Sequence, residues 1–396
     1  MIYAFGACEL DLARYELRCD GHIRKVEPQV FDVLALLVRE RDRVVPKAEI
    51  LDTVWGDRFV SESALTSRIK ALRRALGDDG KAQRYVRTVH GRGYQFVAEV
   101  DERPDPAPGG REPIGLPPQQ IRFCTAHDGV RLAYATMGGG PPLVKAANWL
   151  SHLDYDRETI VWRHWLHELS GRFTLIRYDE RGCGLSDWDV PEQSFEAWVR
   201  DLETVVDAAG LDRFPLLGIS QGGPVAIAYA VRHPERVSSL VLLGSFAEGR
   251  RKRAGTPEDR AYLEARIQLV RSSWARPHPH FRQIFVGRFL PEGTQEEWRQ
   301  FDELQRRSTS AENAWRFLEI FADIDVTDLA ARVSVPTLIA CARGEPEGTF
   351  EQSRVLASLI PGSRFVPLDS ANHLLPERDP GWAQFLHELD VFLGTG

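Results

Sequence analysis

The sequence predicts an α+β domain over residues 1–100, followed by an α/β domain with a mostly parallel sheet over residues 121–396. The chain has 396 residues, which suffices for two domains of ordinary size. Residues 101–120 contain six prolines and three glycines, a composition typical of an extended linker that has little to bury. After this linker, apolar strands alternate with helices, a pattern that favours a parallel sheet with helices on both faces.

Charge is distributed unevenly between the two predicted domains. The formal net charge is -7, which for the whole chain argues against binding to nucleic acid. Residues 60–92 nevertheless hold eight cations against three anions, so a basic face is compatible with an acidic chain. With 43% hydrophobic and 27% charged residues, the composition excludes a disordered, collagen-like or coiled-coil protein.

The cysteine pattern and the N-terminus bear on the cellular compartment. The five cysteines are odd in number and show no C-x-x-C spacing, which favours free thiols in a reducing cytosol. No basic segment followed by a long apolar run opens the chain, and no apolar run approaches the roughly 20 residues of a membrane span. We therefore expect a cytoplasmic protein with no membrane partner and five free thiols, Cys8, Cys19, Cys124, Cys183 and Cys341.

The first domain opens with short segments of alternating apolar and polar residues, which predict a small antiparallel sheet. A helix is expected from Pro28, where a first-turn proline belongs, and another from Ser61, a suitable N-cap. Gly91-Arg92-Gly93 separates two later apolar runs and predicts a hairpin with a basic tip. In order, the expected elements are strands over 2–5, 9–12 and 16–18, helices over 28–38, 47–55 and 61–76, and a hairpin over 85–97.

Three helices, the third basic on one side, followed by a hairpin with an arginine at its turn, form a winged helix-turn-helix. All of residues 1–100 resemble the OmpR/PhoB-type C-terminal effector domain, also used by the ToxR and CadC regulators, through the tracts VVPKAEILDTVWGD, SRIKALRRALGD and YVRTVHGRGYQFVAEV. In that family the third helix lies in the major groove and the hairpin touches the flanking minor groove. The resemblance implies that double-stranded DNA is contacted by Ser63, Thr66, Ser67, Arg68, Lys70, Arg74, Arg87 and Arg92.

Physical chemistry agrees with this resemblance. Arginine and lysine supply salt-dependent binding to phosphate, and an arginine over base edges discriminates guanine by about 1–3 kcal/mol. Which cation reads a base and which meets only phosphate stays open, and a solvated basic face of a protein-binding module is the alternative. Sites for such domains are usually paired, so we expect a homodimer.

In the second domain, a candidate nucleophile follows the third buried strand of the alternating region. The residues Gly218-Ile219-Ser220-Gln221-Gly222 form a G-x-S-x-G motif between an apolar strand and a helix. Glycines are needed there because the serine occupies a strained turn that passes close to neighbouring backbone. A late strand is followed by Glu345 and the last strand by His373, so a nucleophile, an acid and a histidine appear in chain order.

In this order of residues the second domain resembles the α/β-hydrolase fold superfamily. The resemblance extends over nearly all of the domain, including Tyr178–Asp187 and Arg232–Val237. It implies that Ser220 is the nucleophile, that His373 is the general base and then the acid, and that Glu345 orients the imidazole. Asp369 and Glu248 also follow strands and remain alternatives for the acid.

The expected oxyanion hole departs from the family pattern. One donor should be the backbone N–H of Gln221, and the second usually comes from a His-Gly-x segment after an early strand. Here Ala147-Asn148 replaces His-Gly, which disfavours efficient turnover. We expect Trp149 N–H to be the second donor, and we expect Asn148 and the indole of Trp149 at the ligand pocket.

An aromatic-rich insertion at about residues 246–328 is expected to form a helical cap over the carboxyl edge of the sheet, where ligands bind in open α/β folds. No cluster of His, Asp and Glu has convincing ligand spacing, so neither a metal nor another cofactor is expected. His278 and His280 fit a solvated loop, and His164 and His167 fit packing positions in a helix.

Two functions therefore compete. The first is a cytoplasmic transcriptional regulator whose α/β-hydrolase-like domain senses, and in one version also hydrolyses, a small molecule. The second is an active serine hydrolase of the esterase or lactonase type with a DNA-tethering or autoregulatory domain. A third hypothesis is a protein-interaction scaffold with a vestigial hydrolase fold.

Overall fold

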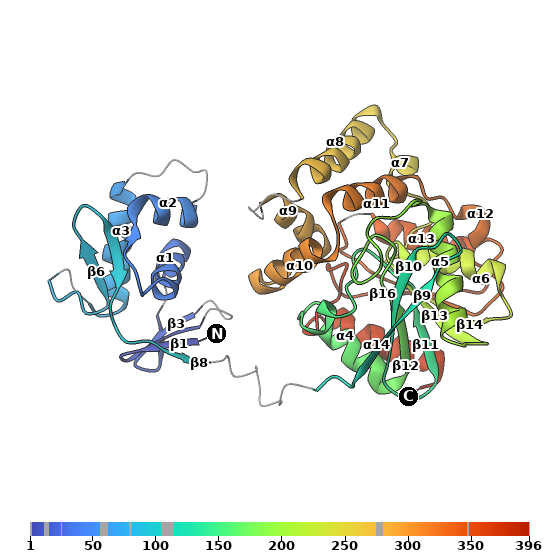
Figure 1. The fold of residues 1–396 in the computed structure, drawn as a ribbon, viewed down its shortest axis with the longest axis horizontal. Coiled ribbons are helices and arrows are strands. Elements are labelled where there is room, and N and C mark those ends of the chain that lie inside the picture. Colours follow the sequence, from blue (N-terminus) through green and yellow to red (C-terminus); the bar gives the residue numbers. More distant parts are fainter. Residues whose placement is uncertain are drawn as a thin grey trace. The chain divides into compact units, whose positions relative to one another are not determined.

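The structure is a computed structural model that describes residues 2–11, 16–24, 26–55, 62–78, 81–103, 115–274, 280–346 and 348–395. The chain forms two compact units, Met1–Ile114 and Gly115–Gly396 (Figure 1). The expected N-cap Ser61 and the expected loop residue His278 lie outside the described residues. Within the described part of the chain, no helix has the length and apolar character needed to cross a membrane.

The first unit combines a five-stranded sheet, three helices and a three-stranded sheet. The strands of the first sheet lie in the order β4-β3-β2-β1-β8, and those of the second in the order β5-β7-β6. The elements are β1 (Ile2–Phe5), β2 (Cys8–Asp11), β3 (Glu16–Cys19), β4 (His22–Arg24), α1 (Pro28–Arg39), β5 (Val45–Pro46), α2 (Lys47–Trp55), α3 (Glu62–Ala75), β6 (Val86–Val89), β7 (Gly93–Phe96) and β8 (Asp101–Arg103). Leu34, Leu65, Leu72 and Phe96 are buried in a core that belongs to this unit alone.

The linker predicted over residues 101–120 is shorter in the structure. Residues Asp101–Arg103 form β8, which pairs with β1 in antiparallel register, and the second unit's first strand begins at Gln119. The Asp-Glu-Arg tripeptide joins the sheet through main-chain hydrogen bonds and contributes no apolar side chain. Composition therefore does not reveal this strand.

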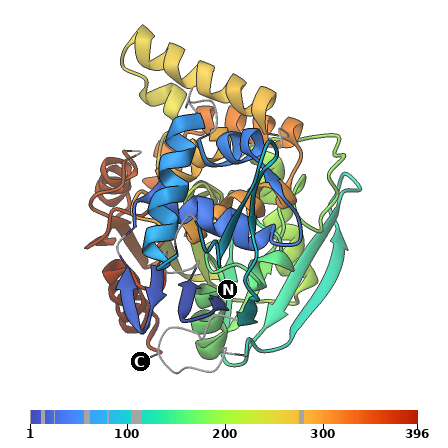
Figure 2. The ribbon, with the colours of Figure 1, turned by 90° about the vertical axis from the view of Figure 1, so that its left-hand side faces the viewer.

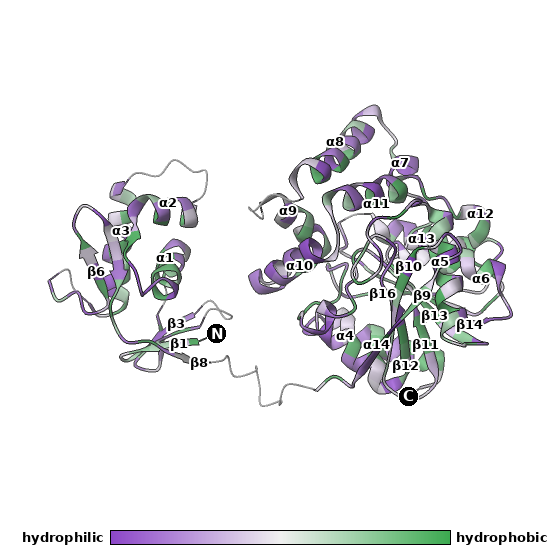
Figure 3. Cartoon of the chain, in the orientation of Figure 1, coloured by the Kyte–Doolittle hydropathy of each residue, from purple (hydrophilic) through white to green (hydrophobic). Residues whose placement is uncertain are grey.

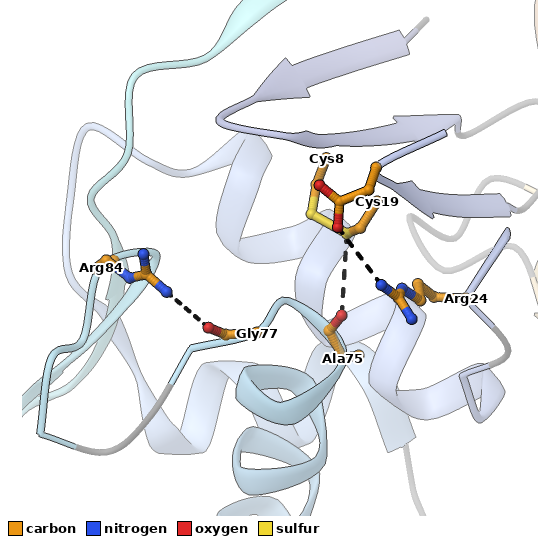
Figure 4. Close-up of a disulfide and its surroundings, with 7 residues drawn as sticks. Cys8, Cys19, Arg24, Ala75, Gly77 and Arg84 are labelled. Carbon is orange, nitrogen blue, oxygen red and sulfur yellow. Dashed lines mark hydrogen bonds and ion pairs between the residues drawn. A yellow bond between two sulfur atoms is a disulfide. The ribbon is translucent and has the colours of Figure 1, made fainter. Parts of the chain in front are cut away.

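A disulfide joins Cys8 of β2 to Cys19 of β3 (Figure 4). The two residues stand directly opposite each other in the antiparallel pair, with Cα atoms 4.1 Å apart. The prediction of free thiols is therefore wrong for this pair, because a cross-strand partner depends on register and not on a spacing motif. Cys124, Cys183 and Cys341 are free thiols.

We expect removal of this disulfide to destabilise the first unit. A cross-link that closes so short a loop restricts the unfolded chain by at most about 3 kcal/mol. Calorimetry of the double variant Cys8→Ser, Cys19→Ser should show a lower unfolding temperature for the first unit only, and dithiothreitol should shift the wild type in the same way. Cys124→Ser, a thiol in the second unit, serves as the control. A first-unit transition insensitive to reductant would contradict the prediction.

The second unit is built on an eight-stranded sheet with the order β16-β15-β14-β13-β11-β12-β10-β9. Its strands are β9 (Gln119–Thr125), β10 (Arg131–Met137), β11 (Pro142–Lys145), β12 (Thr174–Tyr178), β13 (Phe214–Ile219), β14 (Val237–Leu243), β15 (Thr337–Ala342) and β16 (Arg364–Leu368). Strand β10 pairs in antiparallel register with β9 and with β12. All the other neighbouring pairs of this sheet are parallel.

Helices cover both faces of this sheet, as the alternating pattern predicts. Leu216 and Leu217 are neighbours in β13, yet they belong to two different hydrophobic cores, because successive side chains of a strand point to opposite faces. Figure 3 shows the hydrophobic residues concentrated along the central strands. The helices outside the cap are η1 (Tyr155–Arg157), α4 (Arg163–Arg172), α5 (Phe195–Ala208), α6 (Gly222–Arg232), α12 (Thr327–Ala330), α13 (Thr349–Leu359) and α14 (Pro380–Leu393).

The insertion between β14 and β15 is helical. It contains α7 (Arg250–Arg253), α8 (Pro257–Ser273), α9 (His280–Phe289), α10 (Gln295–Ser308) and α11 (Ala311–Asp323). Helix α8, drawn in yellow, projects from the rest of the second unit in both ribbon views (Figures 1 and 2). The backbone N–H of His373 donates to the carbonyl of Phe289 at 2.8 Å, which ties the end of α9 to the loop after β16.

Candidate active site and DNA-binding surface

Ser220 occupies a strained turn between β13 and α6. Its φ is 53°, in the left-handed region that non-glycine residues rarely adopt. A Cβ on Gly222 would lie 2.6 Å from the carbonyl oxygen of Ala147, and one on Gly218 would lie 2.7 Å from Cα of Gly223. The motif glycines therefore permit the close backbone contacts that the turn requires.

The structure brings His373 and Glu345 to the same cavity as Ser220. Because β13, β15 and β16 are parallel, the residues that follow them gather at one edge of the sheet. Nδ1 of His373 lies 3.5 Å from Oε1 of Glu345, and both side chains are buried. Asp369 is exposed, and neither it nor Glu248 lies in the described lining of the cavity, so the geometry favours Glu345 as the acid.

The carboxyl group of Glu345 is held in its ionised form. Burial acts to raise its pKa, but the nearby imidazole of His373 and the hydrogen bonds from Thr349 outweigh this effect and lower the pKa below its ordinary value. The backbone N–H of Thr349 donates to Oε2 at 2.9 Å. An ionised carboxylate beside Nδ1 is suited to orient the imidazole and to stabilise its protonated form.

One of the two expected oxyanion donors, the backbone N–H of Trp149, already forms a hydrogen bond within the protein. The backbone N–H of Trp149 donates to Oε1 of Gln221 at 2.8 Å, and Nε2 of Gln221 donates to Oε1 of Glu180 at 2.9 Å. The side chain of Gln221 thus occupies one of the two donors on which an oxyanion hole would depend. A substrate oxyanion that used both donors would have to displace it.

Asn148 does not lie in the described lining of this cavity, which corrects the expectation that it contributes to the ligand pocket. Its Oδ1 accepts a hydrogen bond from the ammonium group of Lys145, a partly buried residue, and its Nδ2 donates to the carbonyl of Trp149 at 3.2 Å. Asn148 and Lys145 line a smaller, separate cavity. The requirement of a partly desolvated ammonium group for an acceptor explains this orientation.

Glu180 contacts the site through the side chain of Gln221, and sequence reasoning missed it. Burial, followed by the charge of Asp201, raises its pKa to about 8, against the opposing effect of Lys145. Its Oε2 is buried and has no hydrogen-bond partner among the described residues, which suits a protonated carboxyl. Its place two residues after the end of β12, within the Tyr178–Asp187 motif, was the available signal.

We expect Glu180→Gln to flatten the pH dependence of stability of the second unit. The folded pKa of about 8 lies above the unfolded value of about 4.3, so the folded state binds the extra proton between these values. The contribution of the protonated Glu180 carboxyl to the free energy of unfolding is therefore fully present below about pH 4.3, and it is lost as the pH rises towards 8. The variant should gain on the order of 3 kcal/mol relative to the wild type between pH 5.5 and pH 8.5.

Calorimetry at the two pH values measures this gain. The matched control is Glu351→Gln, an exposed carboxyl of α13. Parallel pH profiles for the wild type and Glu180→Gln would refute the prediction.

The cavity beside Ser220 has a volume of about 110 Å³. Trp149 lines this cavity, and its indole packs against Phe285 and Phe321 of the cap with ring centroids 5.6 and 5.7 Å apart. Cap aromatics therefore serve both as cavity wall and as packing. Among the described residues, no group of three or more His, Cys, Asp or Glu side chains is placed to hold a metal ion.

In the first unit, α3 turns its apolar side to the core and its polar side to solvent. Leu65, Ile69 and Leu72 are buried. The exposed residues among the predicted DNA contacts are Ser63, Thr66, Ser67, Lys70, Arg74, Arg87 and Arg92. This face can accept a polyanion without disturbing the core.

Two arginines of α3 have structural partners. Arg68, a predicted DNA contact, forms an ion pair with Glu27 at 2.8 Å and donates to Gln29 at 3.1 Å, which holds it beside the start of α1. Arg73, which was not among the predicted contacts, donates to the carbonyl of Val86 at 2.8 Å and to the hydroxyl of Thr88 at 2.9 Å. Arg73 thereby joins α3 to the hairpin of β6 and β7.

Two family models match this chain, one in each of its two units. The model of the α/β hydrolase fold family matches residues 151–380, and the chain belongs to that family. A model described as "Transcriptional regulatory protein, C terminal" matches residues 23–96. The predicted fold class and both family resemblances are confirmed, so the chain joins the DNA-binding domain of a transcriptional regulator to a hydrolase-like domain.

Individual relatives cover one unit each. The putative carbamate hydrolase RutD of Azorhizobium caulinodans is 26% identical over 63% of this chain and 90% of RutD. The transcriptional regulator HilA of Salmonella typhi is 40% identical over 23% of this chain, which spans only 18% of HilA. A hydrolase structure from Pseudomonas aeruginosa superposes with a TM-score of 0.57 at 24% identity, covering 69% of this chain and 98% of that one, and supports the fold alone.

Proposed function

We propose that this protein is a cytoplasmic transcriptional regulator whose hydrolase-like unit binds a small molecule beside Ser220 as its signal. The observation that carries this proposal is the hydrogen bond from Trp149 N–H to the side chain of Gln221 at 2.8 Å, in a cavity under the cap. The cavity offers a ligand a place beside Ser220, while the N–H expected to serve as the second oxyanion donor is already engaged. A ligand regulates only if its affinity differs between two states of the protein.

The first unit would supply the output of this sensor. With α3 in the major groove, its exposed polar side chains face base edges and phosphates, and Arg87 and Arg92 of the hairpin meet the phosphates that border the flanking minor groove. Binding as a homodimer to paired half-sites is part of the proposal.

A selection from random duplexes by the full chain, followed by gel shifts, tests this function. We expect a selected site to bind at least about 1,000-fold more tightly than random DNA at the same salt concentration. Uniform binding to all sequences would overturn the proposal.

An active serine hydrolase is the second candidate, and the shared cavity of Ser220, His373 and Glu345 favours it. In this version Ser220 attacks an ester, lactone or related carbonyl, His373 accepts the hydroxyl proton and later returns it to the leaving group, and Glu345 stabilises the imidazolium. The side chain of Gln221 would move to release Trp149 N–H for the oxyanion. The fluorophosphonate experiment in the Discussion separates this version from a sensor that does not turn over.

A further inference from the structure

The cavity beside Ser220 is lined on its cap side by four arginines. Arg250 and Arg253 come from α7, Arg266 from α8 and Arg288 from α9. Among the described lining residues only Glu345 is acidic, and its carboxylate already contacts His373 and Thr349. The charged residues of this small cavity therefore carry an excess of positive charge, while most of the other lining residues are apolar.

We propose that the ligand of this cavity is an apolar molecule that carries a carboxylate or phosphate group, and that the anionic group lies against Arg253 and its neighbouring arginines. The inference rests on the proposed function, because it names the class of ligand that the same cavity takes. An arginine fork binds the oxygens of such groups with two parallel hydrogen bonds.

The contrast between two arginines of α7 supports this assignment. Arg251 does not lie in the described lining of the cavity and contacts three carboxylates, those of Glu264, Glu319 and Asp323. Arg253 lines the cavity, and its Nε is buried without a hydrogen-bond partner among the described residues. Among the described residues no carboxylate forms an ion pair with Arg253, so an anionic group in the cavity would supply the counter-charge that its guanidinium lacks.

Burial lowers the pKa values of two arginines of the cluster, Arg253 and Arg266. Burial lowers the pKa of Arg253, although Glu345 and Glu248 act in the opposite direction. Burial and the charge of Arg288 lower the pKa of Arg266 to about 10. Arg266 and Arg288 also share Tyr262, since Arg266 lies over its ring at 5.5 Å and Arg288 donates to its hydroxyl at 3.3 Å. An anion would offset the mutual repulsion of these cations.

Three phenyl probes of similar size test the proposal. Phenylacetate, phenyl phosphate and the neutral phenylacetamide are titrated into the full chain by calorimetry, with Ser220→Ala as background so that no probe is consumed. We expect phenylacetate or phenyl phosphate to bind at least about tenfold more tightly than phenylacetamide, as expected for a charge-assisted contact of about 1.4 kcal/mol. Which of the two anions binds more tightly distinguishes a carboxylate ligand from a phosphate ligand.

Two substitutions on α7 locate the effect. Arg253→Gln should reduce the preference for the anion to threefold or less while binding of phenylacetamide is unchanged, and Arg251→Gln should leave the preference intact. If Arg253→Gln fails to fold, the affinities of the three probes are measured at 50 and 500 mM NaCl without that substitution. Binding of the two anions should then weaken with salt, and binding of phenylacetamide should not.

Equal binding of the three probes, or no binding of any of them, overturns the inference, as does a parallel loss for all three in Arg253→Gln. These outcomes leave sequence-selective binding to DNA and labelling of Ser220 unchanged. Failure of the inference is therefore distinguishable from failure of the proposed function.

Discussion

Replacing Ser220 with alanine is expected to abolish covalent labelling of the full chain by a fluorophosphonate probe. The probe reacts with a serine hydroxyl that a nearby imidazole activates, and His373 and Glu345 line the same cavity as Ser220. If the wild type hydrolyses an activated ester, Ser220→Ala should lower kcat by at least about 1,000-fold, the range seen when a triad member is removed.

Two measurements control this result. Ser358→Ala, an exposed serine of α13, should label like the wild type, and Ser220→Ala should bind the selected DNA with unchanged affinity. Labelling that persists in Ser220→Ala would assign the reactive hydroxyl to another residue. A wild type that labels without ester turnover would match the engagement of Trp149 N–H by Gln221 and favour the sensor without catalysis.

The double variant Lys70→Ala, Arg74→Ala is expected to weaken DNA binding by about 10- to 100-fold at 150 mM salt. Both side chains are exposed on the polar side of α3, and each phosphate contact contributes about 0.9 to the slope of log affinity against log salt. The slope should therefore fall by up to about 2, and an unchanged sequence preference would assign both cations to phosphate.

Gel shifts across a salt series measure both quantities. Lys252→Ala removes an exposed cation from α7 in the second unit and should leave affinity and slope unchanged. A double variant with wild-type affinity at every salt concentration would place the DNA contact elsewhere on the first unit.

Much of the fold was predictable because its signals are local. Period-two and helical patterns, the glycines around Ser220 and the chain order of Ser220, Glu345 and His373 are all visible without coordinates. The glycine signal is physical, since a side chain at Gly222 would meet the backbone of Ala147. Exposure of Lys70 and Arg74 follows equally from the apolar spacing of α3.

Other features depend on which segments fold side by side. Cys8 and Cys19 pair through the register of β2 and β3, and β8 belongs to the first sheet through main-chain pairing alone. The orientation of Arg68 towards Glu27 likewise needs the packing of α3 against α1. A pattern within one segment does not specify its neighbour across a sheet or a helix interface.

The sequence by itself determined that this chain has a basic winged helix and a hydrolase-like domain with a serine, an acid and a histidine in order, because local backbone requirements and periodicity encode these features. Tertiary structure decided that Gln221 engages Trp149, that Glu180 is buried behind it and that four arginines converge on the cavity. Hydrogen bonds and burial between distant segments exist only once the sheet and the cap have assembled, and they set the chemistry of the cavity.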